Sequence, residues 1–357
     1  MVELFEKGFD FDKYENYNTS LFCDENDIDF TIKKILINEE LNTKPGLDIT
    51  YVVTDKLEVN LTNLPSHIKY LRLHAEPVMV YFPDTLEYIE LSLFKISEMD
   101  SDRQANYINL FKNIKWPSNL KSLRVNLLIY NSNYVIANED INEGNMAMYI
   151  PYNLEYLRVN CYVSNIHKFT KLKTYIIDLH NNNECEYTLD SLPPSLEWLE
   201  IMPYNFNHPL NNLPANLKIL KFGQFRLWNI CEGYKHPINN LPIGLEVLYF
   251  PECTTVECTS LGVEMSNLPP NLKILFIPRY IPIDIDINSL PDSIEVLNWY
   301  NFIEHHERFT NYPKNLKKIN VNKKDYEELI SSTKYHILPF KIEVCFENYR
   351  DFTGLTK

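Results

Sequence analysis

The sequence predicts a β-rich solenoid, in which successive repeats each contribute one strand to a curved parallel sheet. Three observations support this fold class: a ten-residue block recurs along most of the 357-residue chain, every block ends in alternating apolar residues, and nearly every block opens with an apolar residue and a proline. Because 45% of the residues are apolar, the chain can bury a large core. The 8 glycines are too few to suggest the glycine-rich loops of phosphate-binding enzymes.

The block consists of an apolar residue, proline, two variable residues, an apolar residue, Lys or Glu, and then variable, apolar, variable and apolar residues, which we number as positions one to ten. Its copies start at Leu64, Phe82, Trp116, Ile150, Leu192, Leu213, Leu241, Leu268, Leu290 and Tyr312, and an eleventh copy at Phe169 lacks the proline and one residue of the spacing. Repeats of this length and leucine content are typical of leucine-rich-repeat-like solenoids.

Each block predicts one short strand over its last positions. Side chains at positions eight and ten point to one side of a strand, and position nine points to the other. The residues expected in the core include Leu71, Leu73, Leu199, Ile201, Leu220 and Leu275. The proline suits the sheet boundary because it has no N–H to donate. At about 22 residues per repeat we expect extended, 3₁₀ or irregular backbone on the convex side, with little helix.

The segments outside the repeats predict two caps around the solenoid. Residues 1–60 form an N-terminal cap of degenerate repeats, 61–321 the solenoid and 322–357 a C-terminal cap. In the last segment, Asp325 and Glu328 predict the start of a short helix, and the alternation from Lys341 to Phe346 predicts a final strand. Three inserts, at 94–115, 127–149 and 252–266, interrupt the repeat spacing.

The charged residue at position six alternates in sign along the whole array. The series is Lys69, Glu87, Lys121, Glu155, Lys173, Glu197, Lys218, Glu246, Lys273, Glu295 and Lys317. Because equivalent residues of neighbouring parallel strands lie about 4.8 Å apart, we expect a row of attractive pairs that specifies register. Asn or Ser also recurs two residues before the proline, for example at Asn212 and Asn240, where it suits either a stacked ladder or an ordinary turn.

Phrases ahead of two copies resemble the FNIP repeat. These are Phe206-Asn207-His208-Pro209-Leu210, and Tyr234-Lys235-His236-Pro237-Ile238. The resemblance covers residues 64–321, and the family is a leucine-rich-repeat relative expanded in slime moulds and giant amoebal viruses. It implies a curved β-solenoid for protein recognition with no catalytic residues. Some members carry an N-terminal F-box and select ubiquitin-ligase substrates, although residues 1–60 show no convincing F-box helices.

Several site classes find little support in the sequence. The net charge of −14, from 34 basic and 48 acidic residues, disfavours nucleic acid. The seven cysteines lack zinc-ligand spacing, and the acidic cluster around His305 and His306 is better explained as a solvated loop. We therefore expect no metal or cofactor and no enzyme. No apolar leader or membrane-length stretch occurs, so we expect a cytoplasmic protein, in the host cytoplasm if it is viral.

The outward positions of the strands predict a partner-binding surface on the concave face. The residues selected for this surface are Arg72, Tyr88, Arg124, Tyr156, Arg158, Trp198, Tyr249 and Phe276. Exposed aromatic and arginine side chains are enriched at interface hot spots. The alternative is that the inserts cover part of this face. The leading hypothesis is recognition of a partner protein. A structural or assembly subunit is the first alternative, and a ubiquitin-ligase substrate receptor is the second.

Overall fold

The computed structural model describes the repeats and parts of both ends. The described residues are 50–53, 58–60, 70–75, 79–94, 114–128, 150–159, 163, 165–177, 189, 191–202, 206, 208–210, 212–222, 240–250, 268–277, 287–299, 311–331 and 341–346. They fall into two compact units, one that ends at Thr174 and one that begins at Tyr175.

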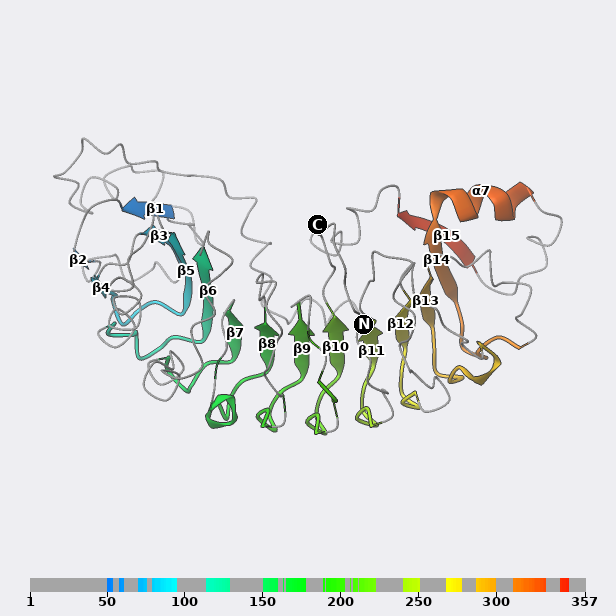
Figure 1. Ribbon diagram of the computed structural model, residues 1–357, viewed down its shortest axis with the longest axis horizontal. Helices are drawn as coiled ribbons and strands as arrows, with labels where there is room; N and C mark the ends of the chain where they lie inside the picture. The colour runs from blue at the N-terminus through cyan, green and yellow to red at the C-terminus, as the bar shows by residue number, and fades with distance from the viewer. Residues whose placement is uncertain are drawn as a thin grey trace. The chain divides into compact units, whose positions relative to one another are not determined.

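The first unit is a run of parallel strands (Figure 1). In spatial order these are β1 (Thr50–Val53), β3 (Tyr70–Ala75), β5 (Tyr88–Phe94), β6 (Ser122–Leu128) and β7 (Tyr156–Val159). Two further strands, β2 (Glu58–Asn60) and β4 (Met79–Tyr81), form a separate parallel pair. A 3₁₀ turn, η3, spans Ile166–Lys168.

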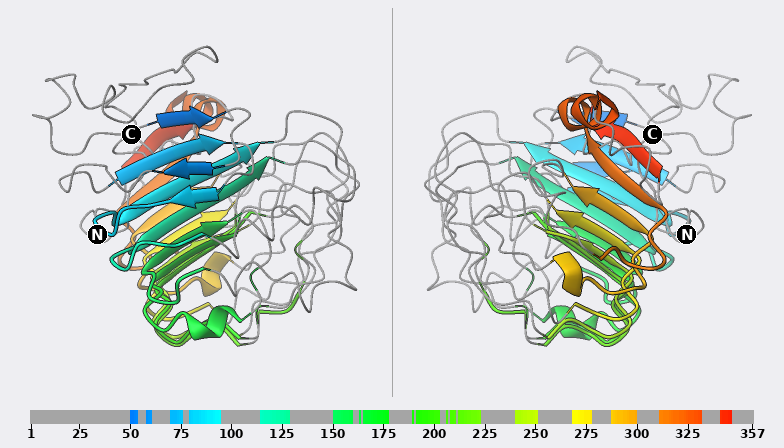
Figure 2. Two further views of the ribbon diagram at one scale, coloured as in Figure 1. Left: turned by 90° about the vertical axis from the view of Figure 1, so that its left-hand side faces the viewer. Right: turned by 90° about the vertical axis from the view of Figure 1, so that its right-hand side faces the viewer.

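The second unit also consists mainly of parallel strands, which follow one another in chain order. They are β8 (Thr174–Ile177), β9 (Trp198–Ile201), β10 (Ile219–Phe222), β11 (Val247–Tyr249), β12 (Ile274–Ile277), β13 (Val296–Trp299), β14 (Lys318–Asn322) and β15 (Lys341–Phe346). The other elements are the 3₁₀ turn η5 (Ile287–Ser289) and helix α7 (Lys323–Ser331), which packs beside β14 and β15 (Figure 2). Every one of the eleven blocks thus supplies a parallel strand, which confirms the predicted β-rich, leucine-rich-repeat-like solenoid.

In eight of the copies, the proline begins a tight turn that precedes the strand. The carbonyl of Pro214 accepts a hydrogen bond of 3.0 Å from the N–H of Leu217, and Pro83, Pro117, Pro193, Pro242, Pro269, Pro291 and Pro313 do the same in their own copies. The proline needs no donor there, because only its carbonyl is used. The turn explains the fixed spacing between the proline and the next apolar residue.

The leucine core lies on the side of the sheet to which positions five, eight and ten point. Leu217 and Leu220 are both 0% exposed, and Phe222 is 5% exposed. Five of the six predicted core residues are buried, namely Leu71, Leu199, Ile201, Leu220 and Leu275. The side chain of Leu73 lies outside the described residues. One repeat cannot bury its apolar face alone, so neighbouring copies build this core together.

In the eleventh copy, Phe169 stands where other copies have proline. The carbonyl of Phe169 accepts a hydrogen bond of 3.0 Å from Leu172, as the prolines do elsewhere. Phe169 therefore occupies position two, not position one, and its ring is 0% exposed. The 3₁₀ turn η3 directly precedes Phe169 in this copy.

The C-terminal cap confirms the predicted helix and strand but corrects where the helix starts. Helix α7 begins at Lys323, and the side-chain oxygen of Asn322 accepts a hydrogen bond of 2.9 Å from the N–H of Asp325. Asn322 is therefore the N-cap and Asp325 lies inside the first turn. The sequence prediction placed the start at Asp325 because it relied on the spacing of Asp325 and Glu328. The same spacing occurs three residues earlier, at Asn322 and Asp325.

The last strand carries charges that suit an edge. Glu343 of β15 forms ion pairs with Lys318 of β14 and Lys341 of its own strand. The hydrogen bonds from both lysines hold the pKa of the Glu343 carboxyl below its usual range. Charged side chains on an edge strand discourage pairing with other chains. Most of the three inserts and most of the N-terminal cap lie outside the described residues.

Candidate functional site

The repeat geometry presents two surfaces that could bind a partner. The first, which we call the flank, carries the side chains of positions three, four and six beside the turns. The second, which we call the outward face, carries positions seven and nine of the strands, on the side opposite the leucine core. The sequence placed the binding surface on the outward face.

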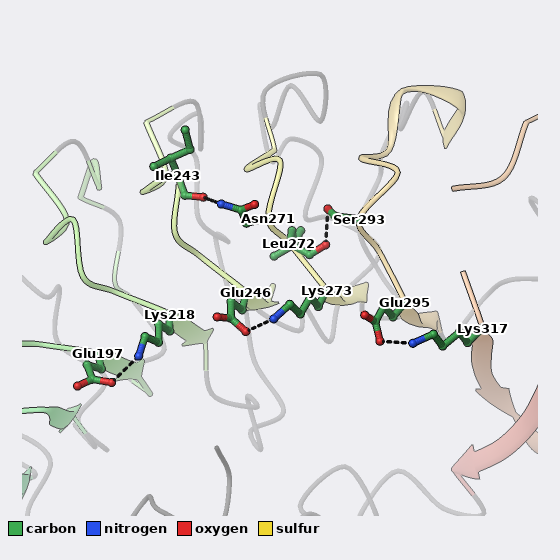
Figure 3. Close-up of polar contacts among 10 residues, drawn as sticks. All are labelled: Glu197, Lys218, Ile243, Glu246, Asn271, Leu272, Lys273, Ser293, Glu295 and Lys317. Atoms are coloured by element: carbon green, nitrogen blue, oxygen red, sulfur yellow. Dashed lines mark hydrogen bonds and ion pairs between the residues drawn. The ribbon is translucent and has the colours of Figure 1, made fainter. Parts of the chain in front are cut away.

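The alternating charges of the flank form ion pairs between neighbouring repeats, as predicted. Figure 3 shows three of them in the second unit, Glu197 with Lys218 (2.9 Å), Glu246 with Lys273 (2.7 Å) and Glu295 with Lys317 (2.8 Å). The first unit adds Glu87 with Lys121 (2.6 Å) and Glu155 with Lys173 (3.5 Å). In all five pairs the glutamate belongs to the earlier repeat, so the row is a series of doublets.

Within each unit, backbone hydrogen bonds join position six of one repeat to the next repeat, from Glu87 to Lys173 in the first unit and from Glu197 to Lys317 in the second. The carbonyl of Glu197 accepts hydrogen bonds from the N–H groups of Lys218 (2.8 Å) and Ile219 (3.0 Å), and the same two bonds recur along the array. The charged side chains therefore leave the sheet side by side. In the first unit, the hydrogen bond to Glu87 raises the pKa of Lys121.

The flank also contains a ladder of asparagines at position four, which the sequence analysis did not find. The amide of Asn216 donates to the carbonyl of Pro194 (2.9 Å), and that of Asn271 donates to Ile243 (3.0 Å; Figure 3). Asn119 and Asn153 make corresponding bonds in the first unit, and Ser293 donates to Leu272 (2.7 Å). The recurrence of Asn or Ser just before the position-five leucine was the signal available in the sequence.

The residues two before the proline, where the sequence suggested a ladder, have a different environment. Ser191, Asn212, Asn240 and Asn311 are exposed, and Ser289 is half-buried. The backbone N–H of Asn311 donates to the side chain of Asn288 (2.9 Å). That bond joins neighbouring repeats through a side-chain amide oxygen that accepts, whereas at position four the side-chain amide donates to a backbone carbonyl of the preceding repeat.

A groove of about 700 Å³ runs along the flank of the second unit. Its lining includes the ladder residues Asn216 and Asn271 together with the two ion pairs formed by Glu197, Lys218, Glu246 and Lys273. Gly244 interrupts the ladder between the two asparagines and also lines the groove. The preceding side chain, Ile243, is 71% exposed, so an apolar group stands at the edge of a polar groove.

On the outward face of the first unit, position nine forms a row of mainly basic residues. Strand register places Arg72 opposite Glu90, Glu90 opposite Arg124, and Arg124 opposite Arg158. The guanidinium of Arg124 lies 3.5 Å from the carboxylate of Glu90. Glu90 is only 6% exposed, and a nearby cation such as Arg124 offsets part of the cost of burying a carboxylate.

On the outward face of the second unit, position nine changes from charged to aromatic to amide residues. Lys221 pairs with the carboxylate of Glu200 (3.0 Å) and lies over the ring of Tyr249, 6.0 Å from its centroid. That ring stacks on Phe276 with centroids 5.2 Å apart. Burial, together with the negative charge of Glu200, raises the pKa of Tyr249 to about 12.

The structure corrects the exposure expected for part of the predicted binding surface. Phe276 is 5% exposed and Tyr156 is 8% exposed, so the expectation that these rings lie open to solvent is wrong. Half-buried side chains remain at Tyr88, Arg124, Arg158, Trp198 and Tyr249, whereas the side chain of Arg72 lies outside the described residues. Close lateral packing of large side chains on adjacent strands, which the sequence pattern alone does not reveal, contributes to this burial.

Among the described residues, no group of three or more His, Cys, Asp or Glu side chains could hold a metal ion. No helix within the same residues has the length and apolar character to cross a membrane. The His305 and His306 cluster lies outside the described residues.

Comparisons with known proteins point to a leucine-rich-repeat neighbour among the solved structures. No family model and no curated protein matches it. Among solved structures it is similar to CroV588, described as a novel circular LRR protein, with a TM-score of 0.30 and 15% sequence identity. The match covers 84% of this chain and 56% of that protein, so the chain spans little more than half the length of this neighbour. The leucine-rich-repeat-like fold therefore stands on the strands, turns and register described above.

Proposed function

We propose that the protein is a non-enzymatic recognition module that binds a partner protein through the outward face of its strands. The observation that supports this most directly is the composition of that face. Trp198, Arg124, Arg158 and Lys221 lie there half-buried, at positions seven and nine of the repeat. The leucine core and the turns require nothing of these positions. Repeat solenoids generally use such extended strand surfaces for binding.

The same face is stiff enough to serve as a binding surface. Arg124 and Lys221 are each held by a neighbouring carboxylate, at 3.5 Å and 3.0 Å, and Tyr249 is held by its stack on Phe276. Side chains that are ordered before binding lose less conformational entropy when a partner docks. Trp, Tyr and Arg are also the residue types most enriched at binding hot spots.

We further propose that the chain is an FNIP-repeat protein that acts in the cytoplasm, and in the host cytoplasm if it is viral. Two residues of the clearest FNIP-like phrase support the family assignment. Phe206 and Leu210 are 6% and 5% exposed, so the aromatic and aliphatic ends of the phrase both contribute to the core. His208 packs edge-on against the Phe206 ring at 5.8 Å.

An assembly role is the second candidate function, and Ile243 favours it. An isoleucine that is 71% exposed beside a groove would be buried if the flank packed against another subunit. The two functions use different surfaces of the repeat. Variants on the two surfaces can therefore separate them.

The test is affinity capture from an extract of the native or infected cells, followed by binding measurements with the purified captured protein. Trp198→Ala should weaken capture by roughly thirtyfold, because hot-spot truncations cost 2 kcal/mol or more. Lys324→Ala, in helix α7 and on neither of the two surfaces, has a side chain that is 82% exposed; it is the control and should bind as wild type does. Circular dichroism must show both variants folded.

Two results would decide against recognition by the outward face. If folded Trp198→Ala binds at full strength while Ile243→Ser loses binding, the flank is the interface and the assembly role replaces the proposal. If no protein is captured saturably by the wild-type chain, the recognition function itself fails.

A further inference from the structure

The flank of the second unit carries a strip of exposed apolar residues at position three. The strip spans four consecutive repeats, whose strands β9 to β12 pair in parallel. Its members are Pro194, Ala215, Ile243 and Pro270, all of them exposed. The fold does not require apolar residues at this position, because the next two repeats place the ion pair of Asp292 and Lys314 there. Contiguous exposed apolar residues typically mark a contact surface.

The flank groove and four members of the charge row belong to the same four repeats as this strip. The groove is lined by residues from positions three, four and six of these repeats. The four charges form two doublets, which are Glu197 with Lys218 and Glu246 with Lys273 (Figure 3). We call the strip, the groove and these four charges the flank patch. Its charges sum to zero, so two copies of the chain can meet there without net local repulsion, although the whole chain carries −14.

The order of the charges makes the flank patch complementary to itself. In chain order the four signs are negative, positive, negative and positive, and the reverse order gives the opposite sign at every place. If a second copy faces the patch with its repeats antiparallel, Glu197 of one copy lies opposite Lys273 of the other. Lys218 and Glu246 face each other in the same way. Parallel rows in register would instead place like charges opposite each other, and such contacts disfavour an arrangement.

The same antiparallel arrangement also brings the apolar strips together. Its twofold axis crosses the patch between the repeats that start at Leu213 and Leu241, so position three of one copy meets position three of the other. Ile243 is 71% exposed and lies opposite the small side chain of Ala215, which lines the groove. A twofold axis repeats this contact, so each isoleucine meets an alanine of the other copy.

We propose that two copies of the chain form a closed dimer through the flank patch, with their repeats antiparallel. This inference rests on the assembly candidate of the proposed function and identifies its partner as a second copy, and it does not depend on recognition by the outward face. A second copy supplies the opposite charge at all four places and a small side chain opposite Ile243. A patch that pairs with itself about a twofold axis is fully used in the dimer, so assembly stops there.

The test is analytical ultracentrifugation of the full-length protein from about 1 µM to about 1 mM, a range that covers the Kd values of weak and moderate complexes. The wild-type chain should convert from monomer to dimer with rising concentration and should form nothing larger. Ile243→Ser should raise the dimer Kd by at least about tenfold, equivalent to about 1.4 kcal/mol, because the side chain is lost from two contacts.

Two double variants, each of which inverts one doublet, test the antiparallel order. Glu197→Lys/Lys218→Glu and Glu246→Lys/Lys273→Glu both keep an ion pair within the doublet. Each variant by itself would place like charges opposite each other at all four places of its dimer, so its Kd should rise by at least about tenfold. An equimolar mixture of the two variants restores opposite charges at every place. The mixture should therefore dimerise although neither variant does so alone.

Lys324→Glu/Glu328→Lys is the matched control. It inverts an exposed Lys–Glu pair of helix α7, outside the flank patch, and leaves the net charge unchanged. Its dimer Kd should stay within about threefold of the wild-type value. Trp198→Ala should also dimerise as the wild type does, so a failure of recognition by the outward face is distinguishable from a failure of this interface.

Several results would overturn the dimer. A wild-type chain that stays monomeric at about 1 mM has no such interface, and growth beyond a dimer excludes the closed twofold arrangement. A wild-type Kd in Ile243→Ser, or an equal loss in the α7 control, removes the flank patch from the contact. A mixture of the folded inverted variants that stays monomeric refutes the antiparallel order. Circular dichroism checks folding, and Ile243→Ser decides by itself if an inverted variant does not fold.

Discussion

Replacing Gly244 with asparagine should stabilise the protein, because it adds the missing member of the position-four ladder. In the repeats on either side, Asn216 and Asn271 donate at 2.9 and 3.0 Å to the carbonyl of position three in the preceding repeat. At Gly244 the equivalent acceptor is the carbonyl of Ala215. A Cβ atom at Gly244 would lie 3.5 Å from that oxygen, which is an ordinary contact, so the new side chain would start beside its acceptor.

The expected gain has two parts. Replacing a glycine where the backbone tolerates a side chain contributes about 0.4–1 kcal/mol by restricting the unfolded chain. The hydrogen bond adds about 0.5–1 kcal/mol, at the lower end of the usual range because the groove is open to solvent. Gly244→Ala should show only the first part. The difference between the two variants therefore measures the ladder bond.

The assay is urea unfolding followed by tryptophan fluorescence, together with hydrogen exchange of the amides near residue 244. Hydrogen exchange is needed because repeat arrays can open locally without unfolding as a whole. Asn216→Gly makes the reverse change one repeat earlier and should lose about 1–2 kcal/mol. The reasoning is refuted if Gly244→Asn is no more stable than Gly244→Ala while Asn216→Gly costs nothing.

Three further changes probe the core, the charge row and the outward face. Leu220→Ala should destabilise the protein by about 2–5 kcal/mol in urea unfolding, since Leu220 is 0% exposed, and a loss below about 1 kcal/mol would place it outside the core. Glu246→Lys should set three cations side by side with Lys218 and Lys273 and cost about 1 kcal/mol at low salt, and the hypothesis fails if 1 M NaCl does not reduce that cost. Tyr249 has its pKa raised from 10.0 to about 12, so deprotonation is harder in the folded state and stability should fall as pH rises through that window. Tyr249→Phe should show a smaller fall in its urea midpoint between pH 10 and 12, and an identical fall would contradict the burial of the phenol.

The strands, the core leucines and the charge row could be predicted because each depends on a short and constant spacing. An alternation of period two assigns Leu199 and Ile201 to the core whatever the rest of the chain does. Once one strand per repeat pairs in parallel at a constant register, Glu197 and Lys218 must be neighbours. Repetition makes these local rules sufficient, since the same environment recurs at every copy.

Other features depended on the tertiary structure because they involve contacts with neighbouring repeats. The sequence could not show that the ring of Phe169 is buried and that its carbonyl makes the turn hydrogen bond made by the prolines of other copies, because both depend on contacts formed in the fold. The sequence left a ladder or an ordinary turn open at the residue two before the proline and did not identify the ladder at position four, since hydrogen bonding across 22 residues, as in Asn216 to Pro194, leaves only a weak local pattern.

The alternation of apolar and variable positions determined by itself which side of each strand faces the leucine core. Only the tertiary structure decided how much of the opposite face meets solvent, because burial there depends on neighbouring side chains. Tyr249 and Phe276 occupy the same position of adjacent repeats, yet Tyr249 is half-buried and Phe276 is 5% exposed. The local spacing determines the direction in which a side chain points, whereas its exposure depends on all the neighbouring groups that pack against it.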